Sequence, residues 1–156
     1  MKKYSQLVEE LSKEITEIFP WDLEERFESD EPPFILDVRE RDEYEVAHID
    51  GSLLVPRGIL ESACEWDYDE TVPELVEARE REVIVVCRSG HRSVLAAYNM
   101  KLLGYKKAIS LKTGLRGWND YEQPLVNGAG DPVDIDEADE FFATKLSDDQ
   151  IDPARR

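Results

Sequence analysis

The stretch VIVVCRSGHRS, residues 83–93, decides the fold of this chain. Its first four residues are apolar and β-branched, which predicts a strand too hydrophobic to face water on either side. Cys87 follows directly, and a helical pattern then runs from Arg92 to Leu103. Gly104 comes next, where a left-handed residue is needed to end the helix. A buried strand followed by a helix is typical of an α/β protein with a parallel sheet.

Further elements are predicted on both sides of this stretch. Two short apolar runs, residues 34–38 and 108–111, are interpreted as strands. Apolar residues recur at helical spacing over residues 3–13 and 21–27, which predicts two short helices near the amino terminus. A strand, a helix and a strand in this order make a βαβ unit, so the sheet is expected to be parallel.

From Gly128 onward the periodic pattern ends and acidic residues dominate. One aromatic pair, Phe141 and Phe142, interrupts them. We interpret this region as a partly ordered tail; the alternative is a docking segment whose phenylalanines pack onto the domain or onto a partner. The chain is therefore divided into an amino-terminal helical extension (residues 1–14), one main domain (15–127) and an acidic carboxyl-terminal tail (128–156).

Composition narrows the classes of function. The chain has 156 residues, of which 41% are hydrophobic, which is enough for one globular domain. Its formal net charge of -17 argues against nucleic acids and anionic membranes as partners, because both are polyanions. No segment has the apolar length of a membrane span, and the first residues lack the apolar core of a signal peptide, so a cytoplasmic location is expected.

The cysteine count also limits the chemistry. Only Cys64 and Cys87 are present, with no Cys-x-x-Cys pair, and the two histidines are far apart in sequence. A disulfide framework and a zinc site are therefore not expected.

The residues around Cys87 carry the chemical prediction. Ligands of open α/β sheets bind outside the carboxyl end of a strand, which is where Cys87 lies. A short polar loop containing Gly90 can turn its backbone N–H groups inward to make a nest for an anion, and the dipole of the next helix adds to it. Such a nest favours the thiolate, which is the nucleophilic form of cysteine. Arg88, His91 and Arg92 add positive charge at the rim, which suits an anionic substrate. The alternative is a buried structural cysteine at a strand end.

Several motifs, taken with this loop, resemble the rhodanese-like domain from about residue 15 to residue 126. The resemblance implies a central parallel five-stranded sheet with helices on both faces. The motifs are ILDVRE (35–40), YEVAHIDG (44–51), LLGY (102–105), the residues Leu111, Gly114 and Trp118, and the closing PLV (124–126).

The resemblance also implies an enzyme of the thiosulfate sulfurtransferase type. Cys87 would attack the outer sulfur of a donor such as thiosulfate, hold that sulfur as a persulfide, and pass it to a thiol or cyanide. The substrate-binding loop would consist of Arg88, Ser89, Gly90, His91 and Arg92. No metal or organic cofactor is implied, and the acceptor could be a carrier protein.

Four positions depart from the family pattern. Ala47 stands where glycine is usual, Asp50 replaces proline, Ser52 replaces alanine, and Thr113 replaces the first of two glycines. These residues lie in supporting turns, so the departures affect the expected loop geometry rather than the chemistry.

Two charged residues are expected to support the site. Asp37, near the carboxyl end of its strand, is predicted to hold Arg92 or the loop amides by charge-assisted hydrogen bonds. Arg39 is predicted to form an ion pair with a nearby acid such as Glu43 or Glu45.

The remaining candidates have more than one interpretation. His48 is expected to act as a hydrogen-bonding clasp, and Arg88 to point toward solvent. Trp118 is either a wall of the active site or a core residue. Cys64 is expected to be a bystander, with a resolving thiol for Cys87 as the alternative.

Other classes of protein remain as alternatives. Cysteine-based phosphatases and arsenate reductases have one more residue between cysteine and arginine than the four that separate Cys87 from Arg92, and the next residue here is Ser93. A non-catalytic binding module would use the same fold without the chemistry. A persulfide relay would use the same chemistry with a dedicated protein as donor or acceptor.

Overall fold

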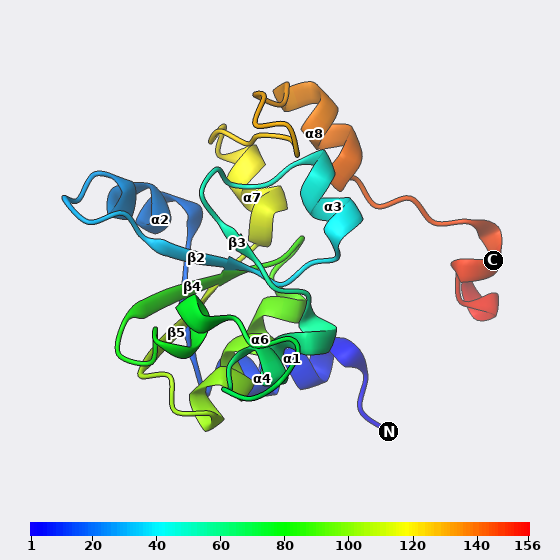
Figure 1. Cartoon of the computed structure of the whole chain (residues 1–156). Coiled ribbons are helices and arrows are strands. Elements are labelled where there is room, and N and C mark those ends of the chain that lie inside the picture. The colour runs from blue at the N-terminus through cyan, green and yellow to red at the C-terminus, as the bar shows by residue number, and fades with distance from the viewer.

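Five short parallel strands form one sheet in the order β1-β5-β4-β2-β3. The computed structural model describes all residues, 1–156. The predicted α/β fold with a parallel five-stranded sheet is confirmed, and Figure 1 shows helices on both faces of the sheet. The strands are β1 (Thr16–Ile18), β2 (Phe34–Asp37), β3 (Leu53–Leu54), β4 (Glu82–Val86) and β5 (Lys107–Leu111).

Eight α-helices surround the sheet. The three helices predicted from periodicity are confirmed as α1, α2 and α6, and Gly104 has the expected positive φ, +94°, after α6. The helices are α1 (Tyr4–Ser12), α2 (Pro20–Phe27), α3 (Arg41–Val46), α4 (Leu60–Ala63), α5 (Pro73–Val76), α6 (His91–Leu102), α7 (Gly114–Asp120) and α8 (Ile135–Phe142); single 3-10 turns cover Arg57–Ile59, Asp148–Gln150 and Pro153–Arg155.

The central strand β4 separates two hydrophobic clusters. Side chains alternate along a strand, so Val83 and Val85 enter the cluster that α6 covers, whereas Ile84 and Val86 enter the cluster that α7 covers. The strand is buried on both faces, as its composition predicts. Cys87 continues the first series and belongs to the cluster on the α6 side.

The region after Gly128 is attached to the domain through α8. Phe142 is 1% exposed and shares a cluster with Trp118, and Phe141 packs against the same cluster. Asp134 caps the start of α8, because its carboxylate accepts hydrogen bonds from the backbone of the first turn. This arrangement matches the docking alternative for the phenylalanine pair rather than the loose tail. The final two 3-10 turns lie away from the sheet in Figure 1.

No helix in the structure is long and apolar enough to cross a membrane.

Candidate active site

The loop after β4 wraps around the sulfur atom of Cys87. The backbone N–H groups of Gly90 and Ser93 donate to Cys87 Sγ at 3.1 and 3.3 Å. Gly90 has a φ of +92°, a conformation that favours glycine and turns the loop inward. Cys87 itself is 1% exposed. Two backbone donors therefore converge on a buried sulfur, which is the geometry of an anion nest.

Two serine hydroxyls continue this hydrogen-bonding environment into the core. Ser93 Oγ lies 3.4 Å from Cys87 Sγ, and Ser110 Oγ lies 2.8 Å from Ser93 Oγ. Both serines are fully buried. Ser110 was not among the residues predicted for the site; the available signal was a hydroxyl between Ile109 and Leu111 in a mostly apolar strand.

The first turn of α7 donates two backbone hydrogen bonds to the start of the cysteine loop. The N–H of Leu115 donates to the Cys87 carbonyl at 2.9 Å, and the N–H of Arg116 donates to the Arg88 carbonyl at 3.0 Å. Gly114 has a φ of +61°, and a Cβ there would lie 2.5 Å from the Arg88 carbonyl. Thr113, one of the departures from the family pattern, also has a positive φ, +70°. The close approach of α7 to the loop therefore depends on Gly114.

Arg92 is held by α3. Its two terminal nitrogens each bond to one carboxylate oxygen of Glu43 at 2.8 Å. Burial opposes ionisation of Glu43, but the hydrogen bonds and charge of Arg92 outweigh it and lower the pKa of Glu43. Hydrogen bonding to Glu43 likewise raises the pKa of Arg92. Both groups therefore stay charged near neutral pH. Because Glu43 is the partner of Arg92, the prediction that Asp37 holds Arg92 is wrong.

Asp37 instead pairs with Arg39, and both side chains are fully buried. Arg39 Nη2 lies 2.8 Å from one Asp37 oxygen and also donates to the Ala47 carbonyl at 2.7 Å. The predicted partners of Arg39, Glu43 or Glu45, are therefore wrong. A buried guanidinium needs a desolvated counter-ion close by, and Asp37, two residues away at the end of β2, supplies it.

Arg88 does not point to solvent, contrary to expectation. Its Nη2 donates to the Phe142 carbonyl at 2.7 Å, at the carboxyl end of α8, where the helix dipole is negative. His91 is exposed, and its ring meets the Tyr4 ring of α1 edge-on, with centroids 5.4 Å apart. Ser89 is half-buried. Segments from both ends of the chain thus contact the cysteine loop.

Comparison with known proteins places this geometry in a family. The model of the rhodanese-like domain matches residues 20–121. The chain belongs to the rhodanese-like domain family. The resemblance proposed from the motifs is thereby confirmed.

Individual relatives show how far the similarity extends. The chain is 37% identical over 118 residues to the Bacillus subtilis protein named "Putative sulfur carrier protein YrkF", and the match covers 76% of this chain and 58% of that protein. It is 31% identical over 103 residues to the Schizosaccharomyces pombe protein named "Putative thiosulfate sulfurtransferase, mitochondrial", covering 64% of this chain and 72% of that protein.

A solved structure from Rhodopseudomonas palustris is similar with a TM-score of 0.70 and 26% sequence identity, covering 80% of this chain and 95% of that one. It is described as a protein of unknown function and a possible tyrosine phosphatase.

The other two supporting residues of this rhodanese-like domain are His48 and Trp118, which also lie outside the cysteine loop. His48 Nδ1 is 2.7 Å from the Tyr44 carbonyl, and the His48 backbone pairs with Val126. The ring therefore bonds within its own segment, and the link to Val126 is made by the backbone alone. Trp118 is 1% exposed and donates from Nε1 to the Pro124 carbonyl at 3.0 Å. Its side chain lies in the core on the α7 side of the sheet, the second of its two interpretations.

Cys64 lies at the end of α4 and is fully buried. Burial is the main cause that raises its pKa, and the charges of Glu61 and Glu65 act in the same direction. Both cysteines are free thiols. The Cys64 side chain belongs to the same hydrophobic cluster as Cys87, and its role as a bystander stays a prediction.

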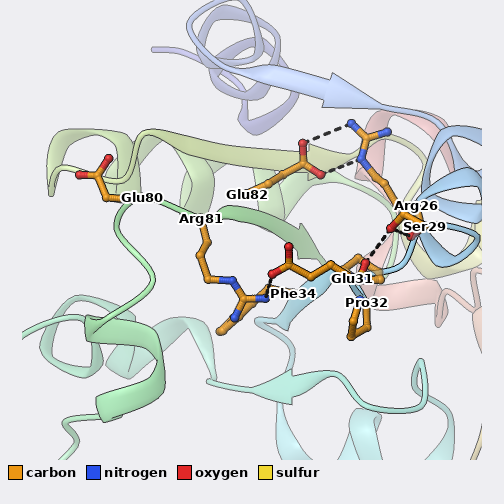
Figure 2. Close-up of a pocket in the computed structure, with 9 residues that line it drawn as sticks. Arg26, Ser29, Glu31, Pro32, Phe34, Glu80, Arg81 and Glu82 are labelled. Atoms are coloured by element: carbon orange, nitrogen blue, oxygen red, sulfur yellow. Dashed lines mark hydrogen bonds and ion pairs between the residues drawn. The ribbon is translucent and has the colours of Figure 1, made fainter.

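A cavity of about 420 Å³ lies at the opposite edge of the rhodanese-like sheet, at the amino ends of β2 and β4. Figure 2 shows Arg26 directed at Glu82, with Arg26 Nε 2.7 Å from a Glu82 oxygen, and Arg81 directed at Glu31 at 3.8 Å. Each guanidinium in this cavity thus lies next to a carboxylate of opposite charge.

Proposed function

We propose that this protein is a sulfurtransferase that carries sulfane sulfur as a persulfide on Cys87. The observation that carries the proposal is the convergence of the Gly90 and Ser93 N–H groups on Cys87 Sγ. These donors stabilise negative charge on sulfur, both in the thiolate and in a persulfide anion.

The reaction needs no oxidant. The Cys87 thiolate attacks the outer sulfur of thiosulfate, a new S–S bond forms, and the old S–S bond breaks with its electron pair leaving on sulfite. Cyanide or a thiolate then attacks the outer sulfur of the persulfide. The Cys87 thiolate leaves with the bonding pair, and the acceptor departs as thiocyanate or as a new persulfide.

The names of two relatives support this chemistry. One is named as a sulfur carrier and the other as a thiosulfate sulfurtransferase. The match spans only 58% of the length of YrkF, so the activity of that whole protein does not apply to this chain. The names favour sulfur transfer in general, and thiosulfate is our choice of donor because it is a small anion. The acceptor is a small thiol, cyanide or a thiol of a carrier protein.

The positive groups of the loop suit an anionic donor in an acidic chain. Arg88 and Arg92 both follow Cys87 in the loop, and both are fixed by hydrogen bonds. Fixed charges need not be ordered when the substrate binds, which lowers the entropic cost of binding.

Phosphatase activity is the second candidate, because the similar Rhodopseudomonas palustris protein is described as a possible tyrosine phosphatase. Four residues separate Cys87 from Arg92, and Arg92 is held by Glu43. A loop of this length encloses a smaller pocket, which suits a sulfur atom better than a tetrahedral phosphate. Hydrolysis of an aryl phosphate that depends on Cys87 would favour this candidate.

Intact-mass spectrometry tests the proposal. Thiosulfate should add one sulfur atom to the wild-type protein, and cyanide should remove it. Peptide mapping should place that sulfur on Cys87. Cys87→Ser should gain nothing, whereas Cys64→Ala should gain one sulfur like the wild type. A folded wild-type protein that takes up no sulfur from thiosulfate or from a small persulfide would instead support a non-catalytic binding module.

A further inference from the structure

Two buried hydroxyls link strand β5 to the cysteine. Ser93 Oγ lies 3.4 Å from Cys87 Sγ and 2.8 Å from Ser110 Oγ. Ser93 is the third residue of α6, whereas Ser110 belongs to β5, the strand beside β4. The two hydroxyl oxygens therefore link the sheet to the Cys87 sulfur, and we call Ser93 and Ser110 the serine pair.

The serine pair lies among apolar side chains. Cys87, Ser93 and Ser110 are at most 1% exposed, and the neighbours of Ser110 in its strand are Ile109 and Leu111. A hydroxyl buried without a partner costs free energy. Ser110 Oγ bonds to Ser93 Oγ, so the position of each hydroxyl is set by the other. Alanine or valine could occupy this position of β5 without needing a hydrogen-bond partner.

The direction of this hydrogen-bond chain depends on the charge of the sulfur. When Cys87 is a thiol, its S–H donates to Ser93, and Ser93 can donate onward to Ser110. When Cys87 is a thiolate, the single hydrogen on Ser93 Oγ must point to the sulfur. Ser110 then has to donate to Ser93 Oγ. Each hydroxyl can serve as donor or acceptor, so the serine pair can reverse.

We propose that Ser110 is a positioning residue for Cys87 that acts through Ser93. By donating to Ser93 Oγ, it fixes the Ser93 hydroxyl toward the sulfur and makes it a better donor to the anion, because hydrogen bonds in a chain polarise one another. The inference deepens the proposed function, since the same donor would stabilise the persulfide anion. The ionisation of Cys87, however, can be tested without any sulfur donor.

The test is the rate of Cys87 alkylation by iodoacetamide as a function of pH, with the site assigned by peptide mass spectrometry. Without the Ser93 hydroxyl the thiolate loses a donor, so Ser93→Ala should slow alkylation at pH 6 by about tenfold, which corresponds to about 1.4 kcal/mol. Ser110→Ala should slow it by about threefold, because Ser93 can still donate but is no longer fixed. At high pH, where the thiol is ionised in every variant, the slowing should vanish or reverse, because a less stabilised thiolate is the stronger nucleophile.

A double variant separates action through Ser93 from a general effect on packing. In Ser93→Ala/Ser110→Ala, alkylation at low pH should equal that of Ser93→Ala alone, because Ser110 has lost the group through which it acts. Ser52→Ala is the matched control. Ser52 is also a buried serine, but its hydroxyl donates to the Ile49 carbonyl, and its removal should leave the Cys87 rate unchanged.

Two results would overturn the inference. One is a Ser110→Ala protein with the wild-type pH profile; the other is an effect of Ser110→Ala that is equally large with and without Ser93. Sulfur uptake is measured on the same proteins. If alkylation follows the expected pattern while no variant takes up sulfur, the role of the serine pair stands and the proposed sulfurtransferase function fails.

Discussion

The two cysteines are equally buried but have different surroundings. Cys64 lies at the end of α4 with Glu61 and Glu65 nearby, and burial raises its pKa although Tyr105 and Arg79 act in the opposite direction. Cys87 lies at the carboxyl end of a strand, with the N–H groups of Gly90 and Ser93 directed at its sulfur. Both side chains belong to the same hydrophobic cluster. Burial alone therefore does not decide what a thiol can do; the groups directed at the sulfur decide it.

Removing each cysteine in turn should give the largest contrast. Cys87→Ser should lose thiosulfate:cyanide sulfurtransferase activity completely, because the persulfide cannot form. Cys64→Ala should keep near wild-type activity and lose about 1–2 kcal/mol of stability from the smaller buried side chain. Steady-state thiocyanate production and urea unfolding measure the two quantities. Loss of activity in a folded Cys64→Ala protein would revive the resolving-thiol alternative.

A methyl group at Gly114 should disturb the surroundings of Cys87 while leaving those of Cys64 intact. The new Cβ would lie 2.5 Å from the Arg88 carbonyl, and the positive φ adds backbone strain. We expect Gly114→Ala to lower stability by about 2–4 kcal/mol and activity by more than tenfold.

Gly130→Ala is the control for Gly114→Ala, because Gly130 also has a positive φ, +84°, but nothing lies within 4 Å of its added Cβ. Its stability should fall only by the cost of the backbone strain, about 1–2 kcal/mol, and its activity should not change. Equal activity losses in the two variants would show that contact with the Arg88 carbonyl does not matter. Thermal melting and thiocyanate assays give both readouts.

Loosening α8 should affect Cys87 indirectly, through Arg88. Phe142→Ala removes a fully buried aromatic side chain, which costs about 3–5 kcal/mol. Because the Phe142 carbonyl accepts from Arg88, a mobile α8 should also lower activity by a few-fold. Phe141, which is only partly buried, provides the matched control, and Phe141→Ala should lose less of both. Unchanged melting of Phe142→Ala would place α8 outside the cooperative domain, consistent with a boundary at residue 127.

The smallest effect concerns the pH dependence of stability. Burial raises the pKa of Cys64 in the folded protein above that of the unfolded chain, which is about 8.5. The folded state therefore keeps this proton to higher pH. The stabilisation is complete below about pH 8.5 and is lost as pH rises through the folded-state pKa.

Between about pH 8 and pH 10, the free energy of unfolding of the wild type should fall more steeply than that of Cys64→Ala. Titrating groups that do not contact Cys64 cancel in the difference. Tyr105 does not cancel, because burial raises its pKa and Cys64 raises it further. Urea titrations at several pH values measure the two slopes. Parallel slopes would mean that the Cys64 thiol is no harder to ionise in the folded protein than in the unfolded chain.

The sequence predicted the elements whose signals are local. The apolar run of β4 and the helical spacing of α6 located the loop, and the apolar runs of β2 and β5 located two further strands. The strands β1 and β3 have three and two residues, too few for a pattern, and they exist because neighbouring strands pair with them. Secondary structure of that length is decided by tertiary contacts.

The ion pairs could not be predicted because charge sign alone does not specify a partner. Two arginines and two acids can pair in two ways. The sequence suggested Asp37 with Arg92, whereas the structure pairs Asp37 with Arg39 and Glu43 with Arg92. The fold decides: Arg39 is fully buried beside Asp37, whereas Glu43 lies on α3 within reach of α6. The Arg88 bond to Phe142 joins residues 54 positions apart, and no spacing rule reaches that far. The inward-facing amides of Gly90 and Ser93, in contrast, follow from the loop's own length and glycine.

The strand order also bears on how the chain folds. β1 lies at the edge of the sheet and pairs with β5, and α1 packs on α6, so the first two elements of the chain depend on elements formed much later. Contacts of this kind form slowly, because the long intervening loop must close before they contribute. The elements α1 and β1 are thus expected to be among the last to reach their places, because β5 and α6 must form before they can pack. Until β1 arrives, β5 presents an unpaired edge to other chains, a period during which a crowded cell would favour aggregation over folding.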